Sequence, residues 1–335
     1  MGHRKNSAPR RGSLAFRPRG RAASLVPSIR TWPTVEEGEP RFLGFCGFKA
    51  GSLHVITTDD REKTPNFGKR RFNAATVLET PPVTICGLRA YHKVRGKERA
   101  IIDVFANELP KELDRLVRIK SGNNEKSLQQ LDSDAQAATR VVAIACARPS
   151  LTGLSQEKPF LFELGVGGKD MKSKIEYVRG LLGKEIPSSE VLKPGMFVDA
   201  IAVSKGKGFE GPVTRHGIKR KQHKSRKSVR AVGVIGPWNP TTMMYTVPRA
   251  GQMGLNQRTE YNKRILLVSE PQNTVTPAGG FPHYGEVKTP YVILKGSVPG
   301  AVKRLVRLRL PLRSPSRKIQ QPKIMEVSTR SNWKA

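Results

Sequence analysis

Acidic side chains are scarce in this sequence. Its 335 residues contain 27 Asp plus Glu against 60 Lys plus Arg, so the formal net charge at pH 7 is +33. Such an excess causes self-repulsion unless a polyanion neutralises it. Nucleic acid is therefore the leading partner class. An anionic membrane surface is the weaker alternative, because the basic tracts lack the aromatic face that interfacial helices use.

Cysteines and long apolar runs are scarce as well. Cys46, Cys86 and Cys146 lie far apart and form no C-x-x-C pair, which argues against a disulfide framework and a zinc ribbon. We expect three reduced, buried thiols. No apolar run approaches the roughly 18 residues that a membrane span needs, so we expect no membrane partner.

Enzyme motifs are absent with one literal exception. There is no G-x-x-x-x-G-K-S/T, no H-E-x-x-H, and no histidine pair at metal-ligand spacing. Gly206, Gly208 and Gly211 match G-x-G-x-x-G, but dinucleotide binding needs a helix to start at the third glycine. Because Pro212 follows and no acid lies in the next ~20 residues, we expect no helix and no nucleotide there. The glycines would instead let the backbone approach phosphates. We expect no enzyme, no cofactor and no metal.

The basic charge is concentrated in one stretch. Residues 205–230 hold ten Lys or Arg and a single acid, Glu210. Such a segment cannot offset the entropy of ordering by burying apolar surface, so alone in water it should be mobile. Apolar runs flank it at 196–203 and 232–238. We expect a long arm carried on a folded body, with a nucleic-acid backbone as its partner.

The first 30 residues hold eight Lys or Arg and no acid. This composition also describes an organellar transit peptide or a solvated tail. Because Pro9, Pro18 and Pro27 would interrupt an amphipathic helix, we expect an extended basic arm that binds nucleic acid.

The remaining sequence predicts a β-rich body with an insertion. Short β-branched and aromatic runs between 41 and 94 indicate strands of a barrel or sandwich. Residues 95–200 are balanced in charge, and apolar residues at helical spacing near 109–117 and 171–182 predict helices, with Asn107 as a possible N-cap. In 306–313, apolar residues alternate with arginines at period two. One face should enter the core, and the other should present arginines either to solvent or, as we prefer, to RNA.

Trp238 lies in a Gly-Pro-Trp-Asn-Pro turn just past the basic tract. It is either folded back on the body or placed at the tip of the arm, where it could stack on a base. We favour the tip.

Several motifs, in order, resemble one known family. They are HRKNSAPRRGSL (3–14), KGKGFEG (205–211), TRHG (214–217), VIGPWNP (234–240), AGQMGLNQRTEYNKRIL (250–266), GGFPHYG (279–285) and LKGSVPGAVKRLVRLR (294–309). Together they resemble the universal large-subunit ribosomal protein L three family in its archaeal or eukaryotic form. Bacterial members lack the tryptophan, and the eukaryotic pattern has Ala and His where this sequence has Pro237 and Asn239. We therefore expect the archaeal form.

The resemblance implies a translation-protein β-barrel with an inserted α/β subdomain and long basic extensions. It also implies a non-catalytic rRNA-binding protein of the large subunit, located in the cytoplasm within the ribosome, that supports assembly and the architecture near the peptidyl-transferase centre. Its partners would be 23S-type rRNA and neighbouring ribosomal proteins, with no homo-oligomer. The competing possibility is a stand-alone RNA or chromatin protein.

Pattern and resemblance together predict the domain organisation. We expect an N-terminal extension at 1–36, a barrel body at 37–94 plus 191–320 interrupted by an rRNA-penetrating arm at 204–262, an α/β insertion at 95–190, and a C-terminal tail at 321–335.

The rRNA contacts are expected from cations of the two arms, from a few cations of the body, and from two histidines and the tryptophan. The alternative for the histidines is polar packing within the arm. The expected residues are Arg4, Lys5, Arg10, Arg11, Arg17, Arg19, Lys205, Lys207, Arg215, His216, Lys219, Arg220, Lys221, His223, Lys224, Arg226, Lys227, Arg230, Trp238, Arg258, Lys263, Lys303 and Arg304.

Overall fold

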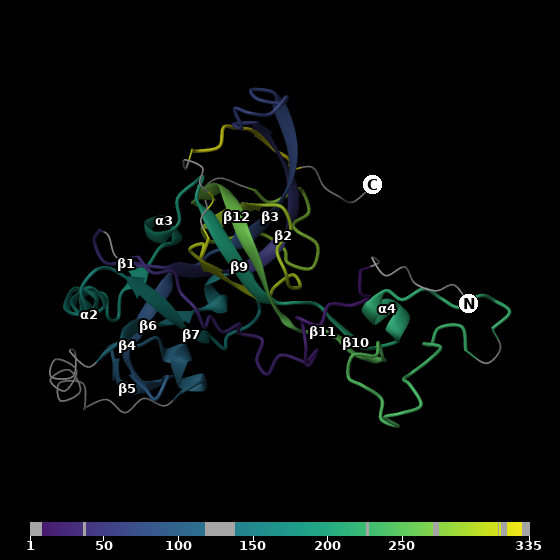
Figure 1. The fold of residues 1–335 in the computed structure, drawn as a ribbon. Coiled ribbons are helices and arrows are strands. Elements are labelled where there is room, and N and C mark those ends of the chain that lie inside the picture. Colours follow the sequence, from purple (N-terminus) through teal and green to yellow (C-terminus); the bar gives the residue numbers. More distant parts are fainter. Residues whose placement is uncertain are drawn as a thin grey trace. The chain divides into compact units, whose positions relative to one another are not determined.

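The computed structural model describes residues 9–35, 38–117, 138–225, 228–270, 275–313, 315 and 320–329. The chain divides into two compact units (Figure 1). The first unit combines the described residues up to Ser24 with Val203–Gln257, and the second contains the described residues of Leu25–Ala202 and Arg258–Ala335. The chain is predominantly β-structure, as the sequence predicts.

In the larger sheet of the second unit, the hydrogen-bonded strands close into a ring. Its order is β14-β9-β12-β13-β3-β2-β15, and β14 also pairs with β2. These strands are β2 (Gly44–Thr58), β3 (Arg70–Glu79), β9 (Phe197–Val203), β12 (Gln257–Ser269), β13 (Tyr291–Lys295), β14 (Leu305–Arg309) and β15 (Ile324–Val327). Side chains of several of them, including Phe48, Leu78 and Ile293, are fully buried.

Strand β2 joins two runs that the sequence suggests are separate. A register shift between Lys49 and Gly51 bends the strand but does not end it. A Cβ on Gly51 would lie 2.3 Å from the Phe281 ring, so only glycine leaves room for that buried phenylalanine. The glycine that looks like a turn signal is therefore a packing position.

A second sheet covers one side of this core. Its order is β1-β7-β6-β4-β5, with β8 paired to β4. The strands are β1 (Arg41–Phe42), β4 (Val83–Val94), β5 (Lys97–Phe105), β6 (Arg140–Ala147), β7 (Phe160–Gly167) and β8 (Glu185–Ile186). The rings of Phe48 and Phe160 join the two sheets with their centroids 5.8 Å apart, so one hydrophobic core serves both.

The border between the sheets differs from the predicted one. The sequence pattern places residues 83–94 in the barrel body, but β4 pairs with both β5 and β6 of the second sheet. The chain changes sheets after Thr80, where Pro81 and Pro82 lack the N–H groups that a ladder needs. Sequence patterns show that both stretches are strands, but pairing decides which sheet each joins.

The helices are short. Those described in the second unit are α2 (Met171–Gly180), α3 (Ser188–Val191) and two 3-10 helices, Lys111–Arg115 and Pro149–Leu151. Helix α2 lies where the spacing of apolar residues predicts it. Residues 109–117 form only the first of these 3-10 helices, with Pro110 rather than Asn107 as its N-cap. No helix of the described residues is long and apolar enough to cross a membrane.

The C-terminal residues are not a loose tail as far as the structure describes them. Strand β15 pairs with β2, and Ser328 N donates to His54 O over 2.9 Å. This strand is only four residues long, too short to separate from a loop by sequence alone. The cysteine prediction is confirmed: all three thiols are free and buried, and burial raises the pKa of Cys46 to about 12.

The arginines of β14 overturn the prediction of an RNA-facing edge. Arg307 and Arg309 are only 3% and 5% exposed. Arg307 donates to Pro27 O and Glu163 O, and its guanidinium lies 4.8 Å from the Phe162 ring centroid. Burial lowers the pKa of Arg307 to about 10. The alternating pattern is real, but its second face packs against other parts of the second unit rather than facing solvent.

Candidate nucleic-acid interface

A two-stranded antiparallel ribbon forms the base of the arm in the first unit. It consists of β10 (Gly206–Glu210) and β11 (Gly251–Gly254), with Gly206 opposite Gly254. Gly254 has a φ of +73°, and a Cβ there would lie 2.1 Å from Lys205 O. Only glycine satisfies both constraints. The ribbon thus fixes the two ends of the loop from 211 to 250.

A five-residue helix, α4 (Pro212–His216), follows β10 directly, so the prediction of no helix after Gly211 was wrong. Proline is favoured in the first helical turn, where its missing N–H has no partner to lose. Gly217, with a φ of +65°, ends the helix. Because β10 pairs antiparallel with β11, the glycine motif lacks the parallel βαβ setting of a dinucleotide site.

Arg215 holds the arm together. Its guanidinium donates to Gln252 O over 3.0 Å and to Arg249 O over 3.1 Å. It also lies 3.0 Å from where a Cβ on Gly251 would stand. The sequence suggests an RNA contact here, and the structure shows that two of the N–H groups of this side chain tie helix α4 to the returning segment.

The N-terminal extension is bonded to the arm within the same unit. Arg19 donates to Arg215 O over 2.9 Å and to Ser13 O over 3.3 Å. Further bonds run from Ala22 N to Leu255 O at 2.7 Å, from Asn256 Nδ2 to Gly20 O at 2.6 Å, and from Arg10 to Thr246 O. Residues 9–24 and the arm, which the sequence presents as two separate tails, form one unit.

His216 is buried in this contact and is only 8% exposed. A Cβ on Gly12 would lie 2.4 Å from its Nδ1, so the extension packs directly on the ring. Burial, and then the charges of Arg19, Arg215 and Arg17, hold the pKa of His216 below its usual value. Of the two roles considered for this histidine, the structure favours packing within the arm.

Most of the predicted cations of the first unit are exposed. No ion pair involving them occurs within the described part of the chain, and the unit's one described acid is Glu210. The exposed predicted residues are Arg10, Arg11, Lys205, Lys207, Lys219, Arg220, His223, Lys224 and Arg230, and Lys221 is half-buried. Arg4, Lys5, Arg226 and Lys227 lie outside the described residues.

The predicted cations of the second unit are less available. Arg258, Lys263 and Arg304 are half-buried, and only Lys303 is exposed. Lys263 is paired with Glu260 at 3.2 Å. Burial lowers the pKa of Arg304.

Trp238 is 95% exposed and therefore does not pack on the described residues of its unit. Tyr245, 72% exposed, was missed by sequence reasoning. Its ring lies under the guanidinium of Arg17, 5.3 Å from the centroid. The signal was present in the run Met243, Met244, Tyr245, because apolar residues in a segment that cannot form a core must either face solvent or bind something.

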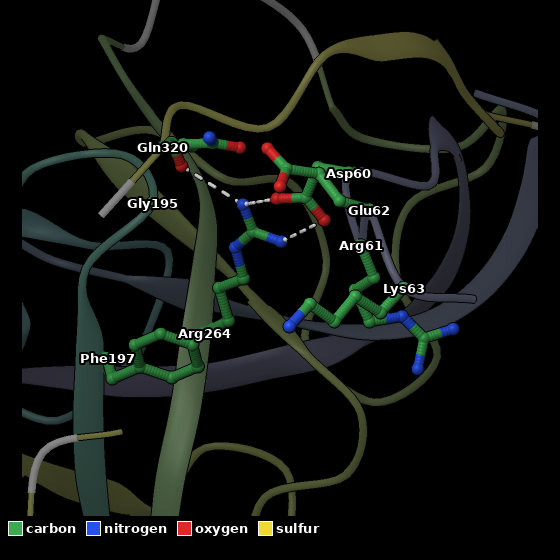
Figure 2. A pocket seen from close by; sticks show the side chains of 8 residues that line it. All are labelled: Asp60, Arg61, Glu62, Lys63, Gly195, Phe197, Arg264 and Gln320. Atoms are coloured by element: carbon green, nitrogen blue, oxygen red, sulfur yellow. Dashed lines mark hydrogen bonds and ion pairs between the residues drawn. The ribbon is translucent and has the colours of Figure 1, made fainter. Parts of the chain in front are cut away.

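A pocket of about 300 Å³ in the second unit is lined by charged side chains of both signs (Figure 2). Figure 2 shows Arg264 bonded to the carboxylate of Asp60 and to Gln320 O, over 2.9 and 3.0 Å respectively. The bond from Arg264 lowers the pKa of Asp60. The two charges of this pair neutralise each other, and the bond to Gln320 O holds the segment that leads to β15.

The buried acid Glu79 is likewise structural. Its carboxylate accepts from Lys288 N and Thr289 N, both over 2.8 Å, and from the Tyr284 hydroxyl. All of its oxygens are therefore used to hold residues 284–289 against β3. No group of His, Cys, Asp and Glu in the described part of the chain could hold a metal ion.

Comparison with known proteins identifies a family. The model of the family Ribosomal protein L3 matches residues 1–333. The large ribosomal subunit protein uL3 of Pyrobaculum aerophilum is 43% identical, over 98% of this chain and 99% of the relative. The uL3 proteins of Methanococcus vannielii and Methanocaldococcus jannaschii are 42% and 43% identical, over 99% and 96% of this chain and 99% and 97% of the relatives. These relatives are archaeal, in agreement with the archaeal form expected from the Pro-Trp-Asn motif.

Proposed function

The chain belongs to the ribosomal protein L3 family, and from this premise we propose that its first unit is the main surface with which it binds large-subunit rRNA. The protein is a structural, non-catalytic component of the large ribosomal subunit and is located in the ribosome, in the cytoplasm. It binds rRNA and neighbouring ribosomal proteins there.

The exposed, unneutralised charge of the first unit carries the proposal. Lys205, Lys207 and the tract Lys219–Lys221 lie on a scaffold whose only described acid is Glu210. Each cation that reaches a phosphate releases condensed counterions, which favours binding. The cations that fold the unit, such as Arg215, hold the others in place.

Trp238 is proposed to contact rRNA by stacking. A tryptophan that is 95% exposed gains nothing from the fold of the free chain. Stacking on a base is worth ~1–3 kcal/mol. We place this tip near the peptidyl-transferase region, which the family resemblance implies, and propose that the protein supports the architecture there and the assembly of the subunit.

The finer architecture belongs to the same proposal. We infer that the closed circuit of β14, β9, β12, β13, β3 and β2 is a translation-protein barrel and that the sheet around β4 and β6 is its inserted α/β subdomain. The support is the return of β14 onto β2, which leaves no free edge between them.

The salt dependence of binding tests the interface. Replacing Lys219, Arg220 and Lys221 with glutamine should weaken binding of the full-length protein to large-subunit rRNA. It should also reduce the slope of log K against log salt by about one unit for each phosphate that is no longer neutralised. The control replaces Lys97, Arg99 and Lys111, three exposed cations of the second unit. If the control lowers the slope as much as the arm variant does, the arm is not the main interface.

A further inference from the structure

The first unit contains a cavity that the proposed function does not assign. Its volume is about 610 Å³, within the range of pockets that hold small ligands. It is lined by Arg17, Pro18, Arg19, Gly20, Arg215 and Tyr245. The wall thus combines the N-terminal extension with the arm, so the cavity exists only while residues 17–20 remain docked.

Three guanidinium groups and no acid line this cavity. Two of them are held in place by backbone carbonyls: Arg19 by Arg215 O, and Arg215 by Arg249 O and Gln252 O. Fixed guanidinium groups lose little freedom when a ligand binds, and their planar forks match the geometry of phosphate oxygens. The cavity is preorganised for an anion.

The fourth functional group is an aromatic ring. Arg17 covers Tyr245 at 5.3 Å from the ring centroid, yet 72% of the tyrosine remains exposed. A planar π-system can therefore stack on the uncovered part of the ring, extending the stack that Arg17 begins. A ligand that uses both features must carry an anionic group beside a flat ring.

We propose that this cavity binds one unstacked nucleotide of an RNA strand, with its phosphate at Arg17 and Arg19 and its base against Tyr245. An acidic peptide would satisfy the guanidinium groups but would leave the tyrosine face without a partner. A free phosphate would do the same. The proposal rests on the proposed function, because it names a particular site within the rRNA-binding unit.

Cross-linking in assembled large subunits identifies the occupant. A benzophenone amino acid placed at position 245 should cross-link to rRNA on irradiation, and the same group at Met325, exposed on β15 of the second unit, serves as the control. Cross-linking at one rRNA position is expected from 245. Cross-linking of 245 to a neighbouring protein, or to nothing, overturns the proposal.

Affinity separates stacking from charge. In the full-length protein, Tyr245→Ala should weaken binding to large-subunit rRNA about 5- to 150-fold with an unchanged salt slope, because stacking releases no counterions. Tyr245→Phe should bind normally. Arg17→Gln should lower the slope by about one unit. Met243→Ala, another exposed side chain of the same loop that does not line the cavity, should have no effect.

The outcomes distinguish this inference from the proposed function. If the native protein binds rRNA with a steep salt slope but Tyr245→Ala matches Tyr245→Phe, the nucleotide pocket is wrong and the interface stands. If the native protein shows no salt-dependent binding, the interface itself fails. Resistance of residues 9–24 to protease in Tyr245→Ala checks that the cavity wall is still docked. Tyr245→Leu keeps an apolar side chain without a ring and should bind rRNA as weakly as Tyr245→Ala.

Discussion

Arg309 donates to the carboxylate of Asp199 over 2.7 Å, at a point where both side chains are shielded from water. Arg309 also donates to Thr31 O over 2.6 Å, and Asp199 accepts from Asn262 N over 3.0 Å. The pair therefore joins β14 and β9 to a segment far away in the sequence.

Removing one partner should be costly. Asp199→Ala should lower the free energy of unfolding by about 3–5 kcal/mol, because it leaves a buried guanidinium without its counter-ion. Urea denaturation followed by circular dichroism measures this. Asp114→Ala, at an exposed aspartate, is the control and should change stability by less than about 0.5 kcal/mol. Replacing both partners, Asp199→Leu with Arg309→Met, should recover much of the loss. Equal stability of Asp199→Ala and the native protein would contradict a structural role for the pair.

The two described tryptophans should respond in opposite ways. Trp238→Ala should leave the stability of the free protein within about 0.5 kcal/mol, because the side chain is exposed. Trp32→Ala should cost about 3–5 kcal/mol, because Trp32 packs on Gly44 and Gly165 and lies under Arg307.

Although Trp238 contributes little to stability, it should matter for the activity of the ribosome. Large subunits carrying Trp238→Ala are expected to assemble but to be impaired in peptide transfer or factor binding, and Trp238→Phe should restore much of the activity. Unfolding of the free protein by Trp238→Ala, or fully normal subunits, would show that the exposed tip has no such role.

Limited proteolysis should reveal that the arm is ordered in part. Composition alone predicts early cleavage throughout 1–30 and 205–230. With the bonds of Arg19 and Arg215 in place, trypsin should instead cut first at Lys219–Lys221 and only later at Arg19 or Arg215. Mass spectrometry of the fragments gives the order. Arg215→Gln should make Arg19 cleavable earlier, whereas equally rapid cleavage at Arg19 and Lys219 in the native protein would mean that the extension is not docked.

The docking of the N-terminal extension on the arm should depend on pH through His216. Its folded pKa lies below the unfolded value, 6.5, so the unfolded unit binds the proton more readily. The stability that the first unit gains from holding His216 neutral is constant above pH 6.5. It is lost as the pH falls from there towards the folded pKa. Trypsin cleavage at Arg19, corrected for the enzyme's own pH profile, should therefore accelerate between pH 7 and 5. His216→Gln should remove that dependence, and His223→Gln, at an exposed histidine, should retain it. An identical dependence in both variants would exclude His216 as its source.

Much of the chain could be predicted from local patterns. The strands between 41 and 94, helix α2, the buried thiols and the exposed tryptophan follow from periodicity and composition. These features depend on near neighbours in the sequence, such as Gly183 just past α2, and on the simple surplus of cations over acids.

The sites that sequence patterns described poorly depend on distant residues. Tyr245 becomes a candidate only because Arg17 lies over it, and His216 is buried because Gly12 packs on its ring. Helix α4 forms although proline follows Gly211, because proline is acceptable at a first turn and the ribbon holds both ends of the segment.

The sequence by itself determined that this protein is a basic, β-rich member of a ribosomal family, because net charge and motif order do not depend on which elements meet in space. It also determined that Arg307 and Arg309 share one face of a strand. Only the tertiary structure decided that this face is inside. A period-two pattern shows which side chains point the same way, whereas burial depends on what covers that side, here Pro27, Thr31, Glu163 and Asp199. Those partners lie more than a hundred residues away along the chain, beyond the reach of any local pattern.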